Sequence, residues 1–569
     1  MKKIVLLILL SIAYISALAE SVVVDGVTYE IIGNSAVIKR WGNSDISVAI
    51  PNTIKYSGSS YTVVAIMSEA FYNKNIETVS IPASVINIQP CAFWCCSAIK
   101  AFYVNVNNPA YTTEAGVLLS KNKTRLIQFP QAKGDAYEVP ESVDTIGAYA
   151  FTYDSRLLSV TLPNNLKCIE SGAFSSCYSM KTCDIPSSVN YIGEEAFHGC
   201  QHLTSVRIPE GIDSIRAYAF SGCSNAVSLV IPKSVKWIAP YSFHNMGMRT
   251  LEIPSSIEEI PDNAFSGCYY LMTLSVGKGV KKIGNYAFSN CTYLSSVRLS
   301  GDLLSLGTEA FSGCSNLSTI TVPSTVTSLG SNCFMKCINL EKAILPQKLD
   351  KIPNGLFDGC VKLKSVTVPD GLESIGAYAF RNCKLTDFSF PSTLQVIGAA
   401  AFQYCPLESL ALPEGVTTIA SQAFIGCNKL KTIRIPASVK SLGSEVFSSG
   451  GSESPADYYV YHKSPLRLTS DPFVNKYYNT LYVPKGSKEL YETAQYWKQF
   501  GHIVTIPLSK GDVNGDFEVN VSDVTTLISY ILGEDTEIED ISVCDVNGDY
   551  DVNVSDVTSI INVILGVEE

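Results

Sequence analysis

The chain has 569 residues, which is more than one ordinary globular core accommodates. Its formal net charge is -11, but the charge is unevenly distributed. Residues 511–569 carry 15 acidic and no basic side chains, whereas residues 1–510 carry 42 basic and 38 acidic ones. The nearly neutral body lacks the basic surplus that attracts nucleic acid, so we expect no nucleic-acid partner. The acidic end requires a separate explanation.

Residues 1–19 predict a signal peptide for export. Two lysines precede an apolar run over residues 4–15, and residues 17–19 read Ala-Leu-Ala, a small-x-small cleavage pattern. The apolar run is short for a membrane span, although an anchoring helix is the alternative interpretation. We therefore expect a mature chain without a membrane span that is secreted to the extracellular space or held at the cell surface.

Residues 20–65 predict a β-rich N-terminal cap. Val, Ile, Thr and Tyr are frequent there, and Asp25-Gly26 separates two such runs in the manner of a hairpin turn. Repeats follow this segment, and a stack of repeats needs a cap because its first coil otherwise leaves an apolar face in water.

Residues 66–450 consist of repeats, which end in a phenylalanine that usually follows alanine. Successive steps are 22 or 23 residues, apart from one gap of 58 between Phe93 and Phe151. Such a period is typical of a solenoid, in which each repeat forms one coil and neighbouring coils share a core. The repeat phenylalanines are Phe71, Phe93, Phe151, Phe174, Phe197, Phe220, Phe243, Phe265, Phe288, Phe311, Phe334, Phe357, Phe380, Phe402, Phe424 and Phe447.

One repeat shows how such a coil would form. Ile433 and Ile435 alternate with polar residues, so both are predicted to face inward from a short strand that ends at Pro436. Gly443, in the following Leu-Gly pair, suits a backbone with positive φ. Stacked coils about 4.8 Å apart would place these strands in a parallel β-sheet, with short turns and irregular structure on the convex side.

The 58-residue gap contains an insertion, at about residues 101–140. Two strand-like runs, at 116–119 and 125–129, flank a turn-like Ser-Lys-Asn-Lys segment. We expect a hairpin that bulges from the stack.

Twelve of the 18 cysteines lie three residues after a repeat phenylalanine. Export favours disulfides, but the regular placement favours a ladder of small buried thiols, with Met246 in the same position of one repeat. Asp154 at that position in another repeat suggests partial exposure there. Without CxxC pairs or a His cluster, metal binding is disfavoured, with the closely spaced Cys91, Cys95 and Cys96 as the one local exception.

The repeat pattern, L-x-x-V-x-I-P-x-S-V-x-x-I-G-x-x-A-F-x-x-C, resembles the BspA-like leucine-rich repeats of bacterial surface proteins. This resemblance covers about residues 60–450. It implies a secreted or surface-exposed solenoid. It further implies adhesion, with a host matrix protein, a bacterial surface protein or a glycan as the partner.

Residues 451–508 predict a C-terminal cap, after a break in the repeat at 448–452. Strand-like runs at 458–461 and 480–484 precede a helical segment over 487–500. The run Leu-Tyr-Val-Pro-Lys-Gly-Ser at 481–487 resembles the C-terminal cap common in the same family. Trp497 is predicted to close the core, with sugar binding as the alternative.

Residues 509–569 contain two nearly identical loops, at 512–523 and 545–556. Calcium is held by loop oxygens at positions 1, 3, 5, 7, 9 and 12, where position 7 contributes its backbone carbonyl. Each loop runs into an apolar helical stretch, at 524–532 and 557–565, that ends at a glycine. A solvated acidic tail is the alternative, but it leaves the repeated Asn positions unexplained. The predicted ligands of two Ca²⁺ ions are Asp512, Asn514, Asp516, Glu518, Asn520 and Asp523, and Asp545, Asn547, Asp549, Asp551, Asn553 and Asp556.

A duplicated loop with one following helix resembles a type I dockerin, a small all-α calcium-binding domain. The resemblance implies a cohesin-like module on a scaffold protein as partner. It also assigns recognition to loop positions 10 and 11, which are Val521 and Ser522, and Val554 and Ser555. Position 6 departs from the family's glycine, because it is Phe517 in one loop and Tyr550 in the other. A positive φ at an aromatic residue costs about 1 kcal/mol or more, which puts calcium affinity or the turn in doubt.

No catalytic motif emerges from the sequence. None of the five histidines belongs to an H-E-x-x-H pattern, and no G-x-S-x-G elbow is present. The leading hypothesis is therefore a non-catalytic binding or adhesion protein attached through its dockerin. The alternatives are a structural subunit of an extracellular polysaccharide-degrading assembly and, third, an enzyme.

Overall fold

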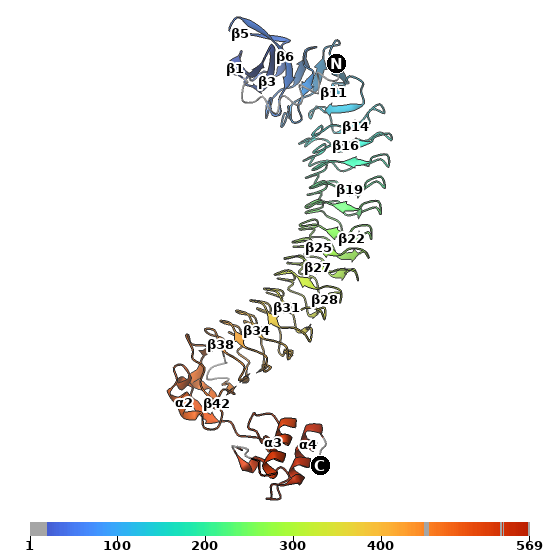
Figure 1. Ribbon diagram of the computed structural model, residues 1–569. Coiled ribbons are helices and arrows are strands. Elements are labelled where there is room, and N and C mark those ends of the chain that lie inside the picture. Colours follow the sequence, from blue (N-terminus) through green and yellow to red (C-terminus); the bar gives the residue numbers. More distant parts are fainter. Residues whose placement is uncertain (1–19, 449–454, 535–537, 539, 567–569) are drawn as a thin grey trace. The chain divides into compact units, whose positions relative to one another are not determined.

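The computed structural model describes residues 20–448, 455–534, 538 and 540–566 (Figure 1). The predicted signal peptide at 1–19 lies outside the described residues, as does most of the predicted break at 448–452. The chain divides into two compact units. The first runs to Leu349 and adds Pro353–Pro369, and the second consists of Asp350–Ile352 and the chain from Asp370 onward. No helix in the described part of the chain is long and apolar enough to span a bilayer.

The first unit begins with a small sheet in the order β1-β2-β3-β6-β5. The Asp25-Gly26 turn joins β1 to β2, and both residues have positive φ, as this kind of hairpin requires. β6 also pairs in parallel with β8, so the sheet continues directly into the stacked coils. The strands are β1 (Glu20–Val24), β2 (Val27–Ile32), β3 (Ser35–Trp41), β5 (Thr53–Tyr56), β6 (Ser59–Ile66) and β8 (Asn87–Ile88).

Regular coils contribute two short strands each, so each unit has two sets of parallel strands, called ladders below, where the sequence predicts one sheet. Figure 1 shows the strands of neighbouring coils one above another. The ladder that precedes the repeat proline comprises β4 (Ser47–Ala49), β7 (Thr78–Ile81), β9 (Ala101–Val104), β13 (Ala136–Glu138), β15 (Ser159–Thr161), β18 (Val206–Arg207), β20 (Leu229–Val230), β22 (Thr250–Ile253), β24 (Thr273–Val276), β26 (Ser296–Arg298), β28 (Thr319–Thr321), β30 (Lys342–Ile344), β32 (Ser365–Thr367), β35 (Ser409–Ala411) and β37 (Thr432–Ile435).

The second ladder lies at the Ile-Gly or Leu-Gly pairs. It comprises β14 (Thr145–Ile146), β16 (Cys168–Ile169), β17 (Tyr191–Ile192), β19 (Ser214–Ile215), β21 (Trp237–Ile238), β23 (Glu259–Ile260), β25 (Lys282–Ile283), β27 (Ser305–Leu306), β29 (Ser328–Leu329), β31 (Lys351–Ile352), β33 (Ser374–Ile375), β34 (Val396–Ile397), β36 (Thr418–Ile419) and β38 (Ser441–Leu442).

Within each unit, repeat phenylalanines of neighbouring coils stack ring on ring in the core. Phe197 donates its backbone N–H to the Ala219 carbonyl of the next coil at 2.8 Å, and its ring lies 5.4 Å from that of Phe220 at an interplanar angle of 6°. Two residues with positive φ flank the phenylalanine of a regular coil, for example Tyr218 and Gly222 around Phe220. Such a coil thus turns sharply on both sides of a buried ring, and neighbouring rings pack face to face.

The inward and outward positions of the sample repeat are as predicted. Ile433 and Ile435 are fully buried, and Arg434 is exposed. The prediction for Gly443 was wrong, because this residue does not have positive φ. A Cβ atom there would lie 2.2 Å from the backbone nitrogen of Ser421, so the glycine is needed for the close approach of two coils.

The cysteine ladder lies in the core, and all eighteen cysteines are in the described residues as free thiols. The thiol of Cys200 donates to the Phe174 carbonyl of the preceding coil at 3.1 Å, and the same contact recurs along the ladder. Asp154 at this position is also fully buried, so the predicted partial exposure was wrong. One Asp154 oxygen accepts from two backbone N–H groups, at Arg156 and Leu157, which explains how the coil accommodates a carboxyl group.

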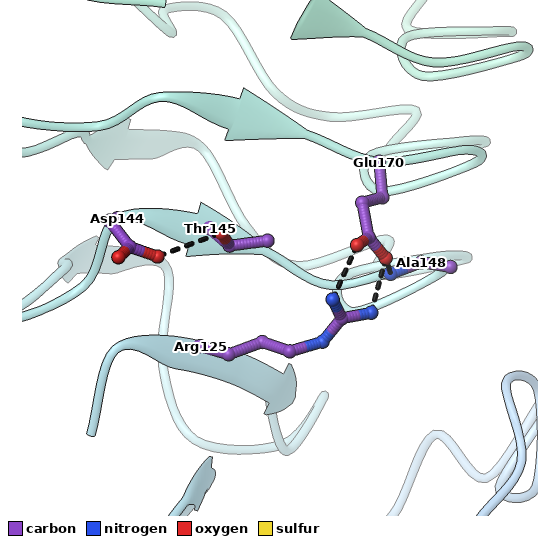
Figure 2. A network of polar contacts seen from close by, with 5 residues as sticks. All are labelled: Arg125, Asp144, Thr145, Ala148 and Glu170. Atoms are coloured by element: carbon purple, nitrogen blue, oxygen red, sulfur yellow. Dashed lines mark hydrogen bonds and ion pairs between the residues drawn. The ribbon is translucent and has the colours of Figure 1, made fainter. Parts of the chain in front are cut away.

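The insertion joins the stack rather than only bulging from it. The strands β10 (Tyr111–Glu114), β11 (Val117–Ser120) and β12 (Arg125–Gln128) are antiparallel, but β12 also pairs in parallel with β14. Phe129 takes the place of a repeat phenylalanine, with its ring 5.0 Å from that of Phe151. Figure 2 shows Arg125 in a two-pronged ion pair with Glu170, which also accepts from the Ala148 N–H at 3.0 Å. The inserted coil is therefore tied to the two coils that follow it.

After the last repeat, the second unit continues the first ladder through β40 (Asp457–Val460), β42 (Thr480–Val483) and β43 (His502–Thr505). Trp497 is fully buried and donates its indole N–H to the Leu466 carbonyl at 3.2 Å, so its predicted role in closing the core is confirmed. The remaining elements here are β39 (Phe447–Ser448), β41 (Phe473–Val474), η2 (Lys476–Tyr478), α2 (Lys488–Thr493) and η3 (Trp497–Gln499).

Candidate functional site

The acidic end folds around two helices, α3 (Val521–Ile531) and α4 (Val554–Leu565), with a short 3-10 turn, η4 (Ile541–Val543), before the second loop. Leu527 of α3 and Ile560 of α4 are fully buried in one small core, together with Val513 and Cys544. Both helices begin three residues before the predicted starts at 524 and 557. This core makes the acidic end a folded unit, which the alternative of a solvated tail does not explain.

The early starts arise from matched N-terminal caps. In α3, the Asn520 side chain accepts from the Ser522 N–H at 2.7 Å, and Asp523 accepts from the Asn520 N–H at 2.8 Å. Asn553 and Asp556 repeat this capping box in α4. A capping box satisfies two helix N–H groups that otherwise lack partners and is worth about 1 kcal/mol per cap. Loop positions 9 and 12 therefore start each helix as well as being predicted ligands.

The residues at loop position 12 also close the loops. Asp523 is fully buried, and its second oxygen accepts from the backbone N–H groups of Val513 and Asn514 at 2.8 and 3.0 Å. In the second loop, buried Asp556 accepts from Val546 and Asn547 in the same way. These contacts bring position 12 against positions 2 and 3, so each loop is curled before it meets any ion.

Asp512, at position 1, provides the test of whether the first loop fits a cation. Its side chain is buried, and one oxygen accepts from the Phe517 N–H at 3.1 Å. The other oxygen is buried without a hydrogen-bond partner among the described residues. Burial, followed by the charges of Asp523 and Asp516, raises the pKa of Asp512 to about 6. A buried carboxylate oxygen without a partner, with two further carboxylates near enough to raise its pKa, suits a divalent cation, so the residues fit Ca²⁺.

The other predicted ligands lie on the loop surfaces. Asn514 and Asp516 are linked by turns in which side-chain oxygens accept from backbone N–H groups two residues later, and Asn547 and Asp549 repeat these turns. Glu518, Asp549 and Asp551 are exposed, and Asp545 is half-buried. Among the described residues, no group of three or more His, Cys, Asp or Glu side chains is already arranged as a metal site. The ligand set predicted for each loop is of another kind, because it combines carboxylates with Asn side chains and one backbone carbonyl.

The two loops share a strained position 6. Phe517 has φ 73° and Tyr550 has φ 71°, so the positive φ expected there is confirmed. The side chains differ in their surroundings: Phe517 is half-buried, with its ring 5.1 Å from that of Tyr461, whereas Tyr550 is 94% exposed. The strain is therefore common to both loops, but only the first has an aromatic partner for its ring in the described structure.

The positions assigned to recognition are available at the surface. Val521 and Val554 are each 66% exposed, and Ser522 and Ser555 beside them are exposed as well. An exposed valine in the first turn of a helix contributes nothing to that helix's own core. The two pairs therefore present the same small surface twice.

A groove of about 670 Å³ in the first unit was not singled out from the sequence. Trp94, Tyr153 and Tyr178 line it, together with Cys91. The sequence feature that could have indicated this groove is the presence of aromatic residues just after Phe93 and Phe151, on either side of the 58-residue gap. The cysteine cluster proposed as a local exception is split: Cys96 belongs to the buried ladder and donates to the Phe71 carbonyl, whereas Cys91 and Cys95 are half-buried.

Comparison with known families gives two matches. The BspA type leucine-rich repeat region matches residues 52–130, 122–248, 236–364 and 350–455, and the dockerin type I domain matches residues 510–565. Both families are non-catalytic modules that are typical of extracellular or surface proteins. The search of curated proteins returned no match.

Several solved structures are similar to this chain. A leucine-rich repeat protein from Bacteroides ovatus is 22% identical, with a TM-score of 0.44, and the match covers 85% of this chain and all of that one. A leucine-rich cell surface protein from Faecalibacterium prausnitzii is 23% identical, with a TM-score of 0.35 and coverages of 73% and 94%. The pneumococcal vaccine antigen PcpA is 19% identical, with a TM-score of 0.39 and coverages of 71% and 94%. On the family match over most of its length, the chain belongs to the BspA-type leucine-rich repeat proteins and carries a type I dockerin domain at its acidic end.

Proposed function

We propose that this chain is a secreted or cell-surface, non-catalytic binding and adhesion protein. In this proposal the solenoid binds a protein or glycan partner, and the dockerin docks the chain to a cohesin-bearing scaffold in the presence of calcium. The observation that carries it is the pair of loops, each of which curls around a buried aspartate and starts a capped helix on a shared core.

Two Ca²⁺ ions are proposed, one in each loop. Positions 1, 3, 5, 9 and 12 would supply side-chain oxygens, and Glu518 and Asp551 would supply backbone carbonyls. Bound calcium would neutralise the gathered carboxylates, which supports the order of the domain because ion binding adds its free energy to folding. Asp523 and Asp556 retain free lone pairs for an ion, since a carboxylate oxygen accepts more than one contact.

Cohesin recognition is assigned to Val521 and Ser522, and equally to Val554 and Ser555. Their identical residue types, exposure and helix positions support two alternative binding orientations related by the internal repeat. Export through the signal peptide at 1–19 is part of the same proposal, because dockerin scaffolds are extracellular. We also propose that the boundaries at 20–65, 66–450, 451–508 and 509–569 are those of functional segments.

Calorimetric titration of Ca²⁺ into the intact chain tests the metal part of the proposal. We expect two ions per chain, one ion in each of the variants Asp512→Asn and Asp545→Asn, and none in the double variant. Asp387→Asn, an exposed acid in the solenoid, is the matched control and should leave two sites. Unchanged titration of the double variant would show that the loops do not hold the ions.

A screen of matrix proteins, bacterial surface proteins and glycans against the intact chain tests the solenoid part. Saturable binding that persists after chelation supports adhesion by the solenoid. If the screen finds no ligand while cohesin docking occurs, the chain is instead a structural subunit of a scaffolded, polysaccharide-degrading assembly. Hydrolysis of a polysaccharide panel would contradict the non-catalytic assignment.

A further inference from the structure

The groove in the first unit lies on the side of the coils where the chain turns next to the repeat phenylalanines. Its lining comes from five coils, those that contain Phe71, Phe93, Phe151, Phe174 and Phe197. It has a volume of about 670 Å³ and opens to solvent, and its lining combines aromatic rings with carboxylates. The dockerin loops and their cohesin-facing residues lie outside this groove.

The groove forms where the inserted coil lacks the usual turn. After Phe129 the chain continues as Pro130 and Gln131, without the pair of positive-φ residues found in regular coils. The Gln128 side chain donates to the Ala150 carbonyl at 3.1 Å, and the Gln131 side chain donates to the Thr152 carbonyl at 2.6 Å. Two glutamine amides thus supply hydrogen bonds that a turn backbone supplies elsewhere, and the space that such a turn would fill remains open.

Three aromatic rings of the lining, those of Trp94, Tyr153 and Tyr178, follow one another along this opening, and the ring of Tyr72 contacts Trp94 from outside the lining. The ring centroids of Tyr72 and Trp94 are 5.9 Å apart, those of Trp94 and Tyr153 are 5.8 Å apart, and those of Tyr153 and Tyr178 are 6.3 Å apart. The interplanar angles are 68°, 49° and 71°, so the rings do not form one flat platform for stacking sugar rings. The lining instead offers rings in several orientations, and the face of an aromatic ring attracts a cation.

Tyr149 adds a fourth ring to the lining because of a glycine in the next coil. Gly172 has φ 62°, and a Cβ atom there would lie 2.2 Å from the Tyr149 ring. The ring therefore lies across the glycine, at a position where a side chain on the next coil would exclude it. The glycine at position 172 therefore allows the Tyr149 ring to join the lining of the groove.

Apart from His198, the acidic and basic side chains of the groove lining have charges of one sign. Glu69 and Glu195 belong to its lining, and none of the described lining residues is a lysine or an arginine. The pKa of the Cys91 thiol is raised to about 12, first by burial and then by the charges of Glu69, Cys95 and Glu195. The negative charges of Glu69 and Glu195 therefore both reach Cys91 in the groove wall, and a cationic ligand would complement them.

We propose that this groove binds lysine side chains presented by a partner protein, with the ammonium groups between the aromatic rings and the carboxylates of Glu69 and Glu195. This inference rests on the proposed role of the solenoid in partner binding and specifies where and how a protein partner is held. Each ring contributes through attraction between its electron-rich face and the ammonium group. A lysine also lays its aliphatic stem along such rings, which suits the apolar part of the lining.

Fluorescence anisotropy with the intact chain and a labelled Gly-Lys-Gly-Lys-Gly peptide tests the proposal. We expect saturable binding that weakens as salt is raised and disappears when the lysines are Nε-acetylated. Trp94→Ala and Tyr178→Ala should each weaken binding by about threefold to thirtyfold. The double variant Glu69→Gln/Glu195→Gln should weaken binding further without a loss of folding, because Glu69 is exposed and Glu195 half-buried.

Matched controls lie in coils beyond the groove. Glu309→Gln changes an acid at the same turn position, with φ 52°, and Tyr286→Ala removes a tyrosine at that position, with φ 56°. Neither should alter binding of the peptide. Equal binding of the acetylated peptide, or an unchanged affinity in the double variant, would overturn the proposal.

A glycan would also give a clear result. If an oligosaccharide binds, Trp94→Ala abolishes that binding and the lysine peptide does not bind, then the groove is a sugar site and the proposal is wrong. If the groove variants leave the binding of solenoid ligands unchanged, this inference fails while the proposed function stands. If the solenoid binds no ligand in the broad screen, the adhesion function itself fails.

Discussion

Asp154 supplies a direct test of how the cysteine ladder is built. In the neighbouring coil Cys177 occupies this position and donates its thiol to the Phe151 carbonyl at 3.1 Å. A carboxylate has no proton to donate, and one Asp154 oxygen is buried without a hydrogen-bond partner among the described residues. A protonated carboxyl group can donate as a thiol does. The position therefore favours the neutral acid.

The magnitude follows from the pKa of this group. Burial, only partly offset by hydrogen bonds from the Arg156 and Leu157 N–H groups, raises the pKa of Asp154 from 3.8 to about 6. Because the folded state holds the proton more tightly than the unfolded state, the folded state loses stability as pH rises between about 4 and 6. One pKa unit is worth about 1.4 kcal/mol, so the full loss above pH 6 is about 3 kcal/mol.

The variant Asp154→Asn isolates this effect. It keeps an oxygen that accepts from the two N–H groups but cannot ionise, so its stability lacks this pH dependence. Urea unfolding of both proteins at several pH values from 4 to 7 gives a difference in unfolding free energy. We expect that difference to move by about 3 kcal/mol in favour of the variant as pH rises. A constant difference would refute the reasoning, and the exposed-site control Asp387→Asn should give a constant one.

Three further predictions follow from single contacts. Gly443→Ala should destabilise the second unit by about 1–3 kcal/mol, because the added Cβ would meet the backbone of the neighbouring coil. The control Gly371→Ala has open space around the added Cβ and should not be destabilising. Urea unfolding midpoints measure both effects. Iodoacetamide at pH 8 should leave buried ladder thiols such as Cys223, with a pKa of about 12, unmodified until the chain is unfolded, and mass spectrometry that found disulfides in the native chain would contradict this. Asp523→Ala should remove a cap acceptor and a calcium ligand together. Hydrogen exchange in α3 should therefore speed up even without calcium, and unchanged exchange would contradict the double role.

The sequence predicts the coils well because their signal is repeated. The phenylalanine period identifies residues that must stack, and alternation around Ile433 identifies the inward side of one strand. The sequence of a single repeat constrains the fold only weakly, but the same pattern in every coil leaves one arrangement that buries all the rings. The repeated Asp and Asn positions identified the acidic loops for the same reason.

Contacts between coils were harder to predict. Gly443 is fixed by Ser421 of the preceding coil, and the burial of Asp154 depends on its place in the stacked core. Phe129 enters the aromatic stack although its coil lacks the repeat motif. In each case the deciding neighbour belongs to another coil, and local pattern carries no information about it.

The candidate site, too, could be predicted from the sequence only in part. Loop residues and helix stretches could be predicted from spacing, but the helix starts could not, because Asn520 and Asn553 act as caps and as loop residues at once. The groove could not be predicted because it arises from a turn that one coil lacks. Only the structure brings Trp94 and Tyr153, which lie on opposite sides of the insertion in the sequence, into contact.

Binding of the intact chain to immobilised cohesin modules, measured by surface plasmon resonance with calcium and after chelation, tests the docking claim most directly. The account predicts calcium-dependent binding that survives substitution of either Val521/Ser522 or Val554/Ser555 alone and is lost when both pairs are replaced. Binding that persists after chelation, or that ignores replacement of both pairs, would contradict it.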